Sequence, residues 1–383
     1  MQVSPACRLS RTTAVVSAWR APVLRDYRLW CKLAARPQKA VMDESLRTNN
    51  FDLLRILAAG QVLIAHAYFH LGIPRPSGFW FVDAFPGVPI FFAMSGFLIS
   101  ASFERSLQIK DYTRNRVLRI FPGLWCCVIA TMVVSALCGI SFVNIQAPLW
   151  FVSQLVGLIY TPQFLSQFGF GSYNGSLWTI PIELQFYVLL PAFYFFAAKR
   201  TKPTEWFWIA FAISIIAAFV CRLYISPLAE NEHEPITQKL LRYSFIPHIY
   251  LFIAGVVLQR LAAHNSRWIR GKGLAWLAGY LAFHFFVPWS NAMYLGGTIL
   301  LAIAAVSLAY TAPNLSATLL HGNDLSYGVY IYHGLFINLM VEKGLMGRPA
   351  YVLLLVVCTS LAAYLSWTFI EKPFLRKKKH SLH

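Results

Sequence analysis

Long apolar runs alternate with short polar segments along most of the chain. An apolar run of about 20 residues is the length that a helix needs to cross a membrane, and the alternation predicts ten such helices. They are expected at 51–71, 88–103, 120–140, 177–198, 205–225, 244–262, 273–289, 293–311, 325–343 and 350–370. A further apolar run at 147–162 is short, and we interpret it as an interfacial or re-entrant segment. The pattern therefore predicts an all-α polytopic membrane protein.

The composition and the charge distribution agree with this fold class. Hydrophobic residues make up 57% of the chain and charged residues only 13%, whereas soluble domains carry about 25% charged residues. The net charge of +18 falls in short patches between the apolar runs, so we expect no nucleic-acid partner. With the N-terminus inside, 26 of the 33 Lys and Arg residues are cytoplasmic and five are outside, as the positive-inside rule requires. Both termini are therefore predicted to be cytoplasmic, in a multi-pass protein of the inner (plasma) membrane bilayer.

Three parts are expected along the chain. Residues 1–48 form a basic N-terminal extension, which is either disordered or lies upstream of a true start at Met42. Residues 49–376 form the transmembrane domain, and 377–383 form a basic C-terminal tail. The seven cysteines are scattered and form no CxxC pair, so we interpret them as small hydrophobic residues and predict no metal site.

His66 and Glu183 are the candidate catalytic residues, because ionisable groups at membrane depth are costly and usually functional. His66 lies about 14 residues, or ~21 Å, from the cytoplasmic start of its span. Glu183 enters from the opposite side and reaches the same level. A carboxylate beside an imidazole raises its basicity and fixes its tautomer, so we predict a catalytic base and its partner. The alternative is a structural pair that joins two helices.

Four arginines are expected at the cytoplasmic surface. Arg55 lies on nearly the same helix face as His66, and three more follow the second span: Arg114, Arg116 and Arg119. Because guanidinium groups suit phosphate, we interpret the four as a site for a phosphate-bearing donor from the cytosol. The alternatives are that Arg55 is a snorkelling anchor and that the other three only set the topology.

The second half of the chain offers further polar residues. His333 is predicted ~12 Å from the cytoplasmic side, where it either contacts substrate or packs against a helix. Glu371 and Lys372 close the last span, and we interpret them as an interfacial anchor. Three residues nearer span ends are interpreted as structural: Arg222, His248 and His284.

Five stretches, in this order, resemble the acyltransferase family 3 of integral membrane acyltransferases. The five stretches are FDLLRILAAGQVLIAH with Arg55 and His66 at the family's signature spacing, FFAMSGFLIS with Ser95, RVLRIFP with Arg116 and Arg119, SLWTIPIELQFYVLLP with Glu183, and SYGVYIYH with Tyr330 and His333. The resemblance covers roughly residues 49–376. It implies an O-acyltransferase that modifies an extracytoplasmic carbohydrate and commonly uses acetyl-CoA.

The same resemblance assigns roles to the matching positions. His66 would be the catalytic histidine, Arg55 its signature partner, and Arg116 and Arg119 the donor-side arginines. Candidate substrate contacts are Ser95, Tyr330 and His333. We therefore expect an O-acetyltransferase with acyl-CoA as its donor substrate, a cell-surface or secreted glycan as its acceptor, and no permanently bound cofactor.

The expected mechanism brings the phosphates of coenzyme A to the arginines while the thioester reaches toward His66. Glu183 would hold His66 as the base that deprotonates a sugar hydroxyl, and a covalent acyl-histidine relay is the alternative route. The rival function is a proton-coupled transporter of a small anion or solute, with Arg55, His66 and Glu183 as a relay. The sequence contains no internal repeat or inverted pair of broken helices that would support a transporter.

Overall fold

A computed structural model of the chain describes residues 46, 48–106, 108–198, 203–225 and 235–377. The predicted extension at 1–48 and the tail at 377–383 lie outside the described residues, apart from positions 46, 48 and 377. The described residues form helices and no strands. The α-helices are α3 (Phe51–His70), α4 (Trp80–Asp83), α5 (Gly87–Ser106), α6 (Ile109–Leu137), α7 (Ala147–Leu155), α8 (Thr179–Ala198), α9 (Pro203–Tyr224), α10 (Ile236–Arg242), α11 (Ile249–Arg260), α12 (Gly273–Phe286), α13 (Asn291–Ala309), α14 (Leu315–Leu320), α15 (Ser326–Glu342), α16 (Ala350–Ser366) and α17 (Lys372–Leu375). Shorter turns are η2 (Ser77–Phe79), η3 (Gln163–Leu165), η4 (Gly175–Trp178), η5 (Ala263–Asn265) and the π-helical η6 (Trp367–Glu371).

Seven helical segments of the described chain are long and apolar enough to cross a membrane. They are Phe51–His70, Ser77–Arg105, Ile109–Leu137, Gly175–Ala197, Glu205–Tyr224, Asn291–Ala309 and Ala350–Leu375. The three remaining predicted spans correspond to α11, α12 and α15, with 12, 14 and 17 residues. A 12-residue helix is ~18 Å long and a hydrocarbon core is ~30 Å thick, so the count of ten crossing helices stays a prediction. The run at 147–162 contains only the nine-residue α7.

The short helix α11 is buried on most of its faces because it packs very closely on α5. A Cβ atom added at Gly96 of α5 would lie 1.9 Å from the carbonyl oxygen of Phe252, and one added at Gly255 of α11 would lie 2.0 Å from that of Ala93. Only glycine fits at these two positions. Small residues that let backbones approach are typical of helix pairs in membranes.

Helices α3 and α15 run side by side in the same direction. Near the start of α3, Arg55 lies 3.7 Å from the carboxylate of Asp324, which immediately precedes α15. Farther along both helices, His66 Nδ1 lies 3.0 Å from His333 Nε2. Arg55 and His66 are separated by ~16 Å along α3. The pairing of α3 with α15 therefore connects two levels of the molecule.

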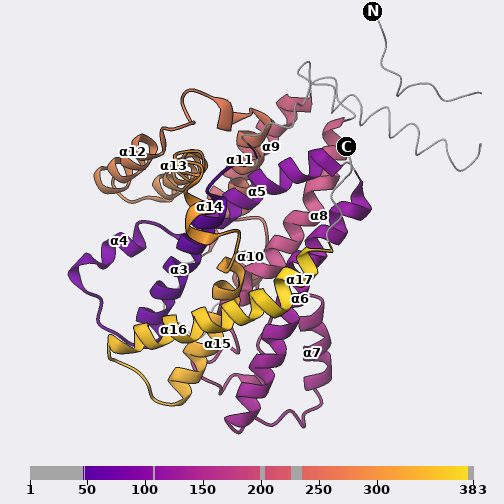
Figure 1. The fold of residues 1–383 in the computed structure, drawn as a ribbon, viewed down its shortest axis with the longest axis vertical. Helices are drawn as coiled ribbons and strands as arrows, with labels where there is room; N and C mark the ends of the chain where they lie inside the picture. Colours follow the sequence, from indigo (N-terminus) through magenta and orange to yellow (C-terminus); the bar gives the residue numbers. More distant parts are fainter. Residues whose placement is uncertain (1–45, 47, 107, 199–202, 226–234, 378–383) are drawn as a thin grey trace, which may run out of the picture.

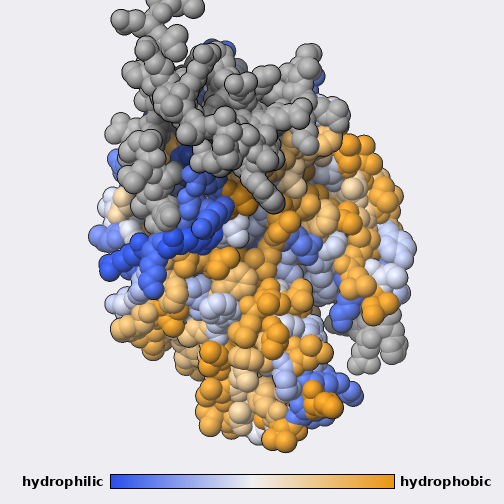
Figure 2. Space-filling model, turned by 90° about the vertical axis from the view of Figure 1, so that its right-hand side faces the viewer, coloured by the Kyte–Doolittle hydropathy of each residue, from blue (hydrophilic) through white to orange (hydrophobic). Residues whose placement is uncertain are grey.

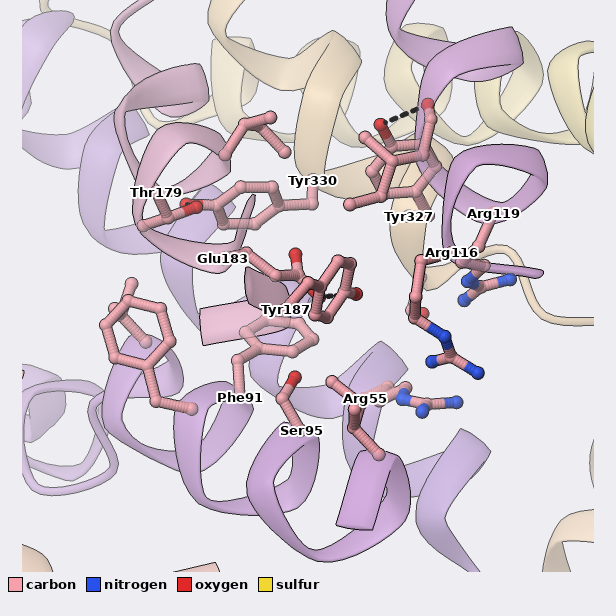
Figure 3. A pocket seen from close by; sticks show the side chains of 16 residues that line it. Arg55, Phe91, Ser95, Arg116, Arg119, Thr179, Glu183, Tyr187, Tyr327 and Tyr330 are labelled. Carbon is pink, nitrogen blue, oxygen red and sulfur yellow. Dashed lines mark hydrogen bonds between the residues drawn. The ribbon is translucent and has the colours of Figure 1, made fainter. Parts of the chain in front are cut away.

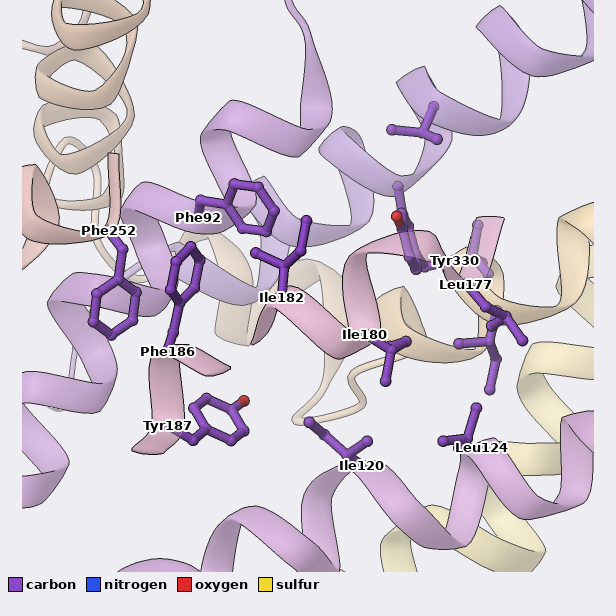
Figure 4. Close-up of a cluster of buried hydrophobic side chains, with 14 of the residues drawn as sticks. Phe92, Ile120, Leu124, Leu177, Ile180, Ile182, Phe186, Tyr187, Phe252 and Tyr330 are labelled. Atoms are coloured by element: carbon purple, nitrogen blue, oxygen red, sulfur yellow. The ribbon is translucent and has the colours of Figure 1, made fainter. Parts of the chain in front are cut away.

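A buried hydrophobic cluster surrounds the first half of α8 (Figure 4). The ring of Phe186 stacks on that of Phe252 of α11 with centroids 4.6 Å apart, and it meets Phe92 of α5 edge-on at 5.2 Å. On another side of α8, Ile180 faces Ile120 of α6. Because α8 is fixed against three helices, the polar residues on its first two turns are held in place.

The molecular surface is strongly hydrophobic. On α9, Ile213 and Ile216 are 61% and 64% exposed, and on α16, Leu353 and Leu361 are 68% and 58% exposed. Figure 2 shows hydrophobic side chains over most of one face, with the hydrophilic ones gathered in patches, and Figure 1 shows α12 beside α13 on one side of the molecule and α6 beside α7 on the opposite side. Exposed apolar area on this scale suits lipid rather than water, which supports the predicted class of polytopic membrane protein.

Candidate active site

A cavity lined by three arginines lies between α3, α5, α6, α8 and α15, and we call it the arginine cavity. Figure 3 shows Arg55, Arg116 and Arg119 grouped on one side of it, with Glu183 and Tyr330 away from them. The remaining lining residues are Val88, Phe91, Phe92, Ser95, Ile99, Ile120, Thr179, Ile180, Tyr187, Ser326 and Tyr327. Along α5 the lining runs from Ile99 back to Val88, eleven residues or ~16 Å. The arginine cavity therefore extends deep into the molecule, over about the distance that separates Arg55 from His66.

Asp324 positions two of the three arginines. Its carboxylate forms an ion pair with Arg119 and lies 3.7 Å from Arg55, which also contacts Asp52 at 2.8 Å. The hydroxyl and the backbone N–H of Ser326 donate to the other oxygen of Asp324. Burial alone would raise the pKa of the Asp324 carboxyl, but the guanidinium groups of Arg119 and Arg55 outweigh burial and hold that pKa well below its usual range. Asp324 is thus an anion that orients Arg55 and Arg119 at the cavity.

Arg116 is held differently and keeps its charge available. One of its terminal nitrogens donates to Ser102 at 3.3 Å, and its guanidinium lies 5.7 Å from the ring centroid of Tyr187. Within the described residues it has no ion pair, and its buried Nε has no hydrogen-bond partner. The exposed Arg114 does not line the cavity. The structure therefore brings together three of the four predicted donor-side arginines.

His66 is paired with His333, and the pairing determines where the protons lie. The backbone carbonyl of Val329 can only accept, so His333 Nδ1–H donates to it over 3.1 Å. A neutral imidazole has one donor and one acceptor, which makes His333 Nε2 an acceptor. His66 Nδ1–H must then donate to that atom over 3.0 Å. His66 is therefore left with a lone pair on Nε2.

The predicted pairing of His66 with Glu183 is wrong. Glu183 lines the arginine cavity and accepts a hydrogen bond from the Tyr187 hydroxyl, one turn along α8. His66 faces α15 and is also 5.7 Å, ring to ring, from His70. Both residues lie deep in the molecule, but α3 packs mainly on α15 and α5 rather than on α8. The side of a helix that meets a neighbour depends on packing between distant segments, which depth alone does not reveal.

Tyr330 connects the arginine cavity to the histidine pair. Its hydroxyl lies 2.8 Å from that of Thr179, and its ring lies 5.9 Å from the ring of His333. Of the three predicted substrate contacts, Ser95 and Tyr330 line the cavity. His333 is fully buried and does not line it. In the structure His333 therefore contacts His66, and neither imidazole lines the arginine cavity.

The match to a known family decides which protein class this site belongs to. A family model described as an acyltransferase domain matches residues 48–370. The chain belongs to this family. No solved structure gives a significant match to the chain.

The relatives of this acyltransferase include named O-acetyltransferases. The chain is 32% identical to nodulation protein 10 of Rhizobium leguminosarum bv. viciae, over 86% of this chain and 93% of that protein. It is 28% identical to the O-acetyl transferase of Shigella phage Sf6, over 88% of this chain and 98% of that protein. It is 25% identical to the peptidoglycan O-acetyltransferase OatA of Listeria monocytogenes, over 85% of this chain but only 55% of OatA. These names support an O-acetyltransferase.

Two acidic residues of the acyltransferase are buried although their burial was not predicted from the sequence. Asp324 stands first in the stretch DLSYGVYIYH, and an acid directly before a predicted apolar span was a usable signal. Glu371 was predicted to be an interfacial anchor, which is wrong, because it is only 2% exposed and accepts from the Ser366 hydroxyl at 2.9 Å. It lies in the π-helical turn η6, in which Trp367 and Glu371 are both buried. In the described part of the chain, no three His, Cys, Asp or Glu side chains gather as a potential metal site.

Proposed function

We propose that this acyltransferase moves an acetyl group from cytosolic acetyl-CoA to a hydroxyl group of an extracytoplasmic carbohydrate, in the inner (plasma) membrane. The observation that carries the proposal is the hydrogen bond from His66 to His333. It leaves an unprotonated nitrogen, His66 Nε2, on a fixed ring. A general base needs a lone pair held in a defined direction, and this arrangement supplies one.

In the proposed reaction, His66 Nε2 takes the proton of the acceptor hydroxyl while the oxygen attacks the thioester carbonyl carbon. The new C–O bond forms, the C–S bond breaks, and the proton passes from His66 to the departing thiolate. The products are an O-acetyl ester and the free thiol of coenzyme A. A covalent acyl-histidine intermediate would form at the same Nε2, so both routes depend on the hydrogen bond to His333.

The arginine cavity is the proposed donor site. Guanidinium groups bind phosphate oxygens through paired N–H donors, and coenzyme A carries several phosphates at one end of a long pantetheine arm. Arg116 lacks an ion pair within the described chain, which suits it to an incoming phosphate. The lining then continues past Ser95 to Val88 and Tyr330, so an extended arm would bring the thioester toward the histidine pair.

The carbohydrate acceptor is proposed from the relatives, because the name of the Listeria relative specifies peptidoglycan. The transporter alternative, with Arg55, His66 and Glu183 as a relay, is disfavoured by two observations. The family model that matches is an acyltransferase, and Glu183 pairs with Tyr187 rather than with His66.

The test is mass spectrometry of envelope and secreted glycans. Cells that lack the chain are compared with cells that carry the intact chain, His66→Ala, or the control His284→Ala, whose side chain lies in α12, away from the histidine pair and outside the arginine cavity. We expect alkali-labile acetyl esters with the intact chain and the control only. Esters restored by His66→Ala would contradict the site, and unchanged glycans in all four strains would contradict a carbohydrate acceptor.

A further inference from the structure

A second cavity lies beyond the deep end of the arginine cavity, and we call it the aromatic cavity. Its volume is about 550 Å³, within the range of roughly 300–1,000 Å³ that is usual for small-molecule sites. Val88 and Pro89, at the start of α5, contribute to its lining, whereas Ser102 near the end of α5 contacts Arg116. The two cavities therefore approach one another from opposite ends of the helices. The side chains of the aromatic cavity that matter here are Trp178, Arg222, His248, Trp289, Asn291 and Tyr294.

Arg222 is held rigidly in this cavity. Its guanidinium stacks on the ring of Tyr294, with Cζ 3.7 Å from the ring centroid, and its Nε–H donates to Asn291 Oδ1 at 3.3 Å. Stacking fixes the plane of the guanidinium, and the Asn291 bond fixes its rotation within that plane. A planar group with several N–H donors in a fixed direction suits neighbouring hydroxyls or a carboxylate. A purely structural role for Arg222, as interpreted from the sequence, would leave these fixed N–H donors without a function.

Aromatic rings also line the aromatic cavity. Trp289 is 70% exposed at the cavity, and Trp178 lies 5.6 Å, ring to ring, from His248. His248 Nε2 donates to the backbone carbonyl of Arg242 at 3.0 Å, which leaves its Nδ1 as an acceptor in the neutral ring. The cavity thus combines flat apolar surfaces with fixed donors and an acceptor.

This combination matches one chemical class. A pyranose ring has apolar C–H faces that pack on aromatic rings, and its rim of hydroxyls needs both donors and acceptors. We infer that the aromatic cavity binds a pyranose ring of the acceptor carbohydrate. The inference deepens the proposed function and rests on it, because it assigns the acceptor side of the same reaction.

The position of the aromatic cavity supports this assignment. Val88 and Phe92 line both cavities, so one layer of side chains separates them. Of two consecutive residues, Trp178 lines the aromatic cavity and Thr179 lines the arginine cavity. Thr179 also contacts Tyr330, which adjoins the histidine pair. A sugar in the aromatic cavity would therefore lie directly across a thin wall from the proposed donor.

The test uses the full chain in nanodiscs made of phosphatidylcholine alone, which removes anionic lipid headgroups as competing ligands. Transfer from radiolabelled acetyl-CoA is measured against increasing amounts of the envelope glycan fraction of the same cells. Trp289→Ala and Arg222→Gln should each raise the apparent KM for glycan at least tenfold and leave the KM for acetyl-CoA unchanged. The matched controls are Trp80→Ala and Arg75→Gln, whose side chains are exposed and lie outside the cavity lining.

A binding measurement separates this inference from the proposed function. Saturation-transfer NMR with an N-acetylglucosamine tetramer and with a galacturonate tetramer reports binding without any reaction. Signals that Arg222→Gln and Trp289→Ala weaken, with no acetyl transfer by the intact chain, would keep the sugar site and contradict the transferase mechanism. Intact transfer with an unchanged KM for glycan in both variants would overturn the sugar site and keep the mechanism. Neither transfer nor sugar binding would overturn both.

Discussion

Replacing His333 with Phe tests the histidine pair most directly. Phe keeps an aromatic ring at this fully buried position but removes the acceptor for His66 Nδ1–H. When His66 takes up the proton its ring becomes cationic, and the hydrogen bond from its Nδ1–H to His333 then stabilises that charge by about 1.5–3 kcal/mol, while each ~1.4 kcal/mol added to the barrier slows the reaction tenfold. We therefore expect kcat to fall about tenfold to a hundredfold. Removing the base itself with His66→Ala should cost more, on the order of 10²–10⁴.

The assay is release of the coenzyme A thiol by the purified chain, with kcat and KM determined separately. The KM for acetyl-CoA should stay constant, because His333 does not line the arginine cavity. His284→Phe is the control for exchanging a histidine for a phenylalanine in a helix. A kcat for His333→Phe within twofold of the intact chain, at an unchanged melting temperature, would refute the assignment of His333 as the residue that orients His66.

Three further predictions follow from the donor cavity and the helix packing. Arg116→Gln should raise the KM for acetyl-CoA about tenfold to a hundredfold, since one charged hydrogen bond contributes about 1.5–3 kcal/mol, whereas Arg114→Gln on the same helix should leave it unchanged. Equal effects would contradict the arginine cavity as the donor site. Gly255→Ala should destabilise the protein by roughly 1–3 kcal/mol through overpacking, measured as a lower melting temperature, while Gly279→Ala, where a Cβ meets nothing within 4 Å, should be neutral. Asp324→Asn should reduce the free energy of unfolding at neutral pH by about 3 kcal/mol, which is measured as a lower melting temperature. Because the pKa of Asp324 is lowered in the folded protein, the stability that its carboxylate contributes is present above the unfolded pKa of about 4 and is lost in more acid solution. A difference in melting temperature between intact and variant protein that does not change with pH would contradict this.

The sequence predicts the depths of the polar residues better than their partners. The rise per residue of a helix is a local property, so the separation of Arg55 from His66 follows from their positions alone. The partner of His66 does not, because α3 and α15 meet through contacts between segments about 270 residues apart. Glu183 lies at a plausible depth and still faces another cavity.

The grouping of the arginines at one cavity is predicted more completely for a physical reason. Arg55, Arg116 and Arg119 are charged groups at the ends of apolar runs, and the topology alone places such groups at one surface. The acid that orders Arg55 and Arg119, Asp324, lies more than 200 residues from both in sequence. Only the folded chain reveals that one carboxylate serves two arginines.

The thin wall formed by Val88 and Phe92 has a consequence for the energy balance of the cell. A membrane that holds a voltage stores ~2.3 kcal/mol per charge for every 100 mV, and a continuous water path through any protein would dissipate it. Phe92 lines both cavities and is only 3% exposed, so its ring leaves little room for a continuous water path between them. In the proposed reaction the acceptor hydroxyl and the thioester carbon have to meet at this partition, so the acetyl group changes carriers by exchanging one covalent bond for another, and no pore has to open. The protein would then export acetyl groups while remaining an electrical insulator.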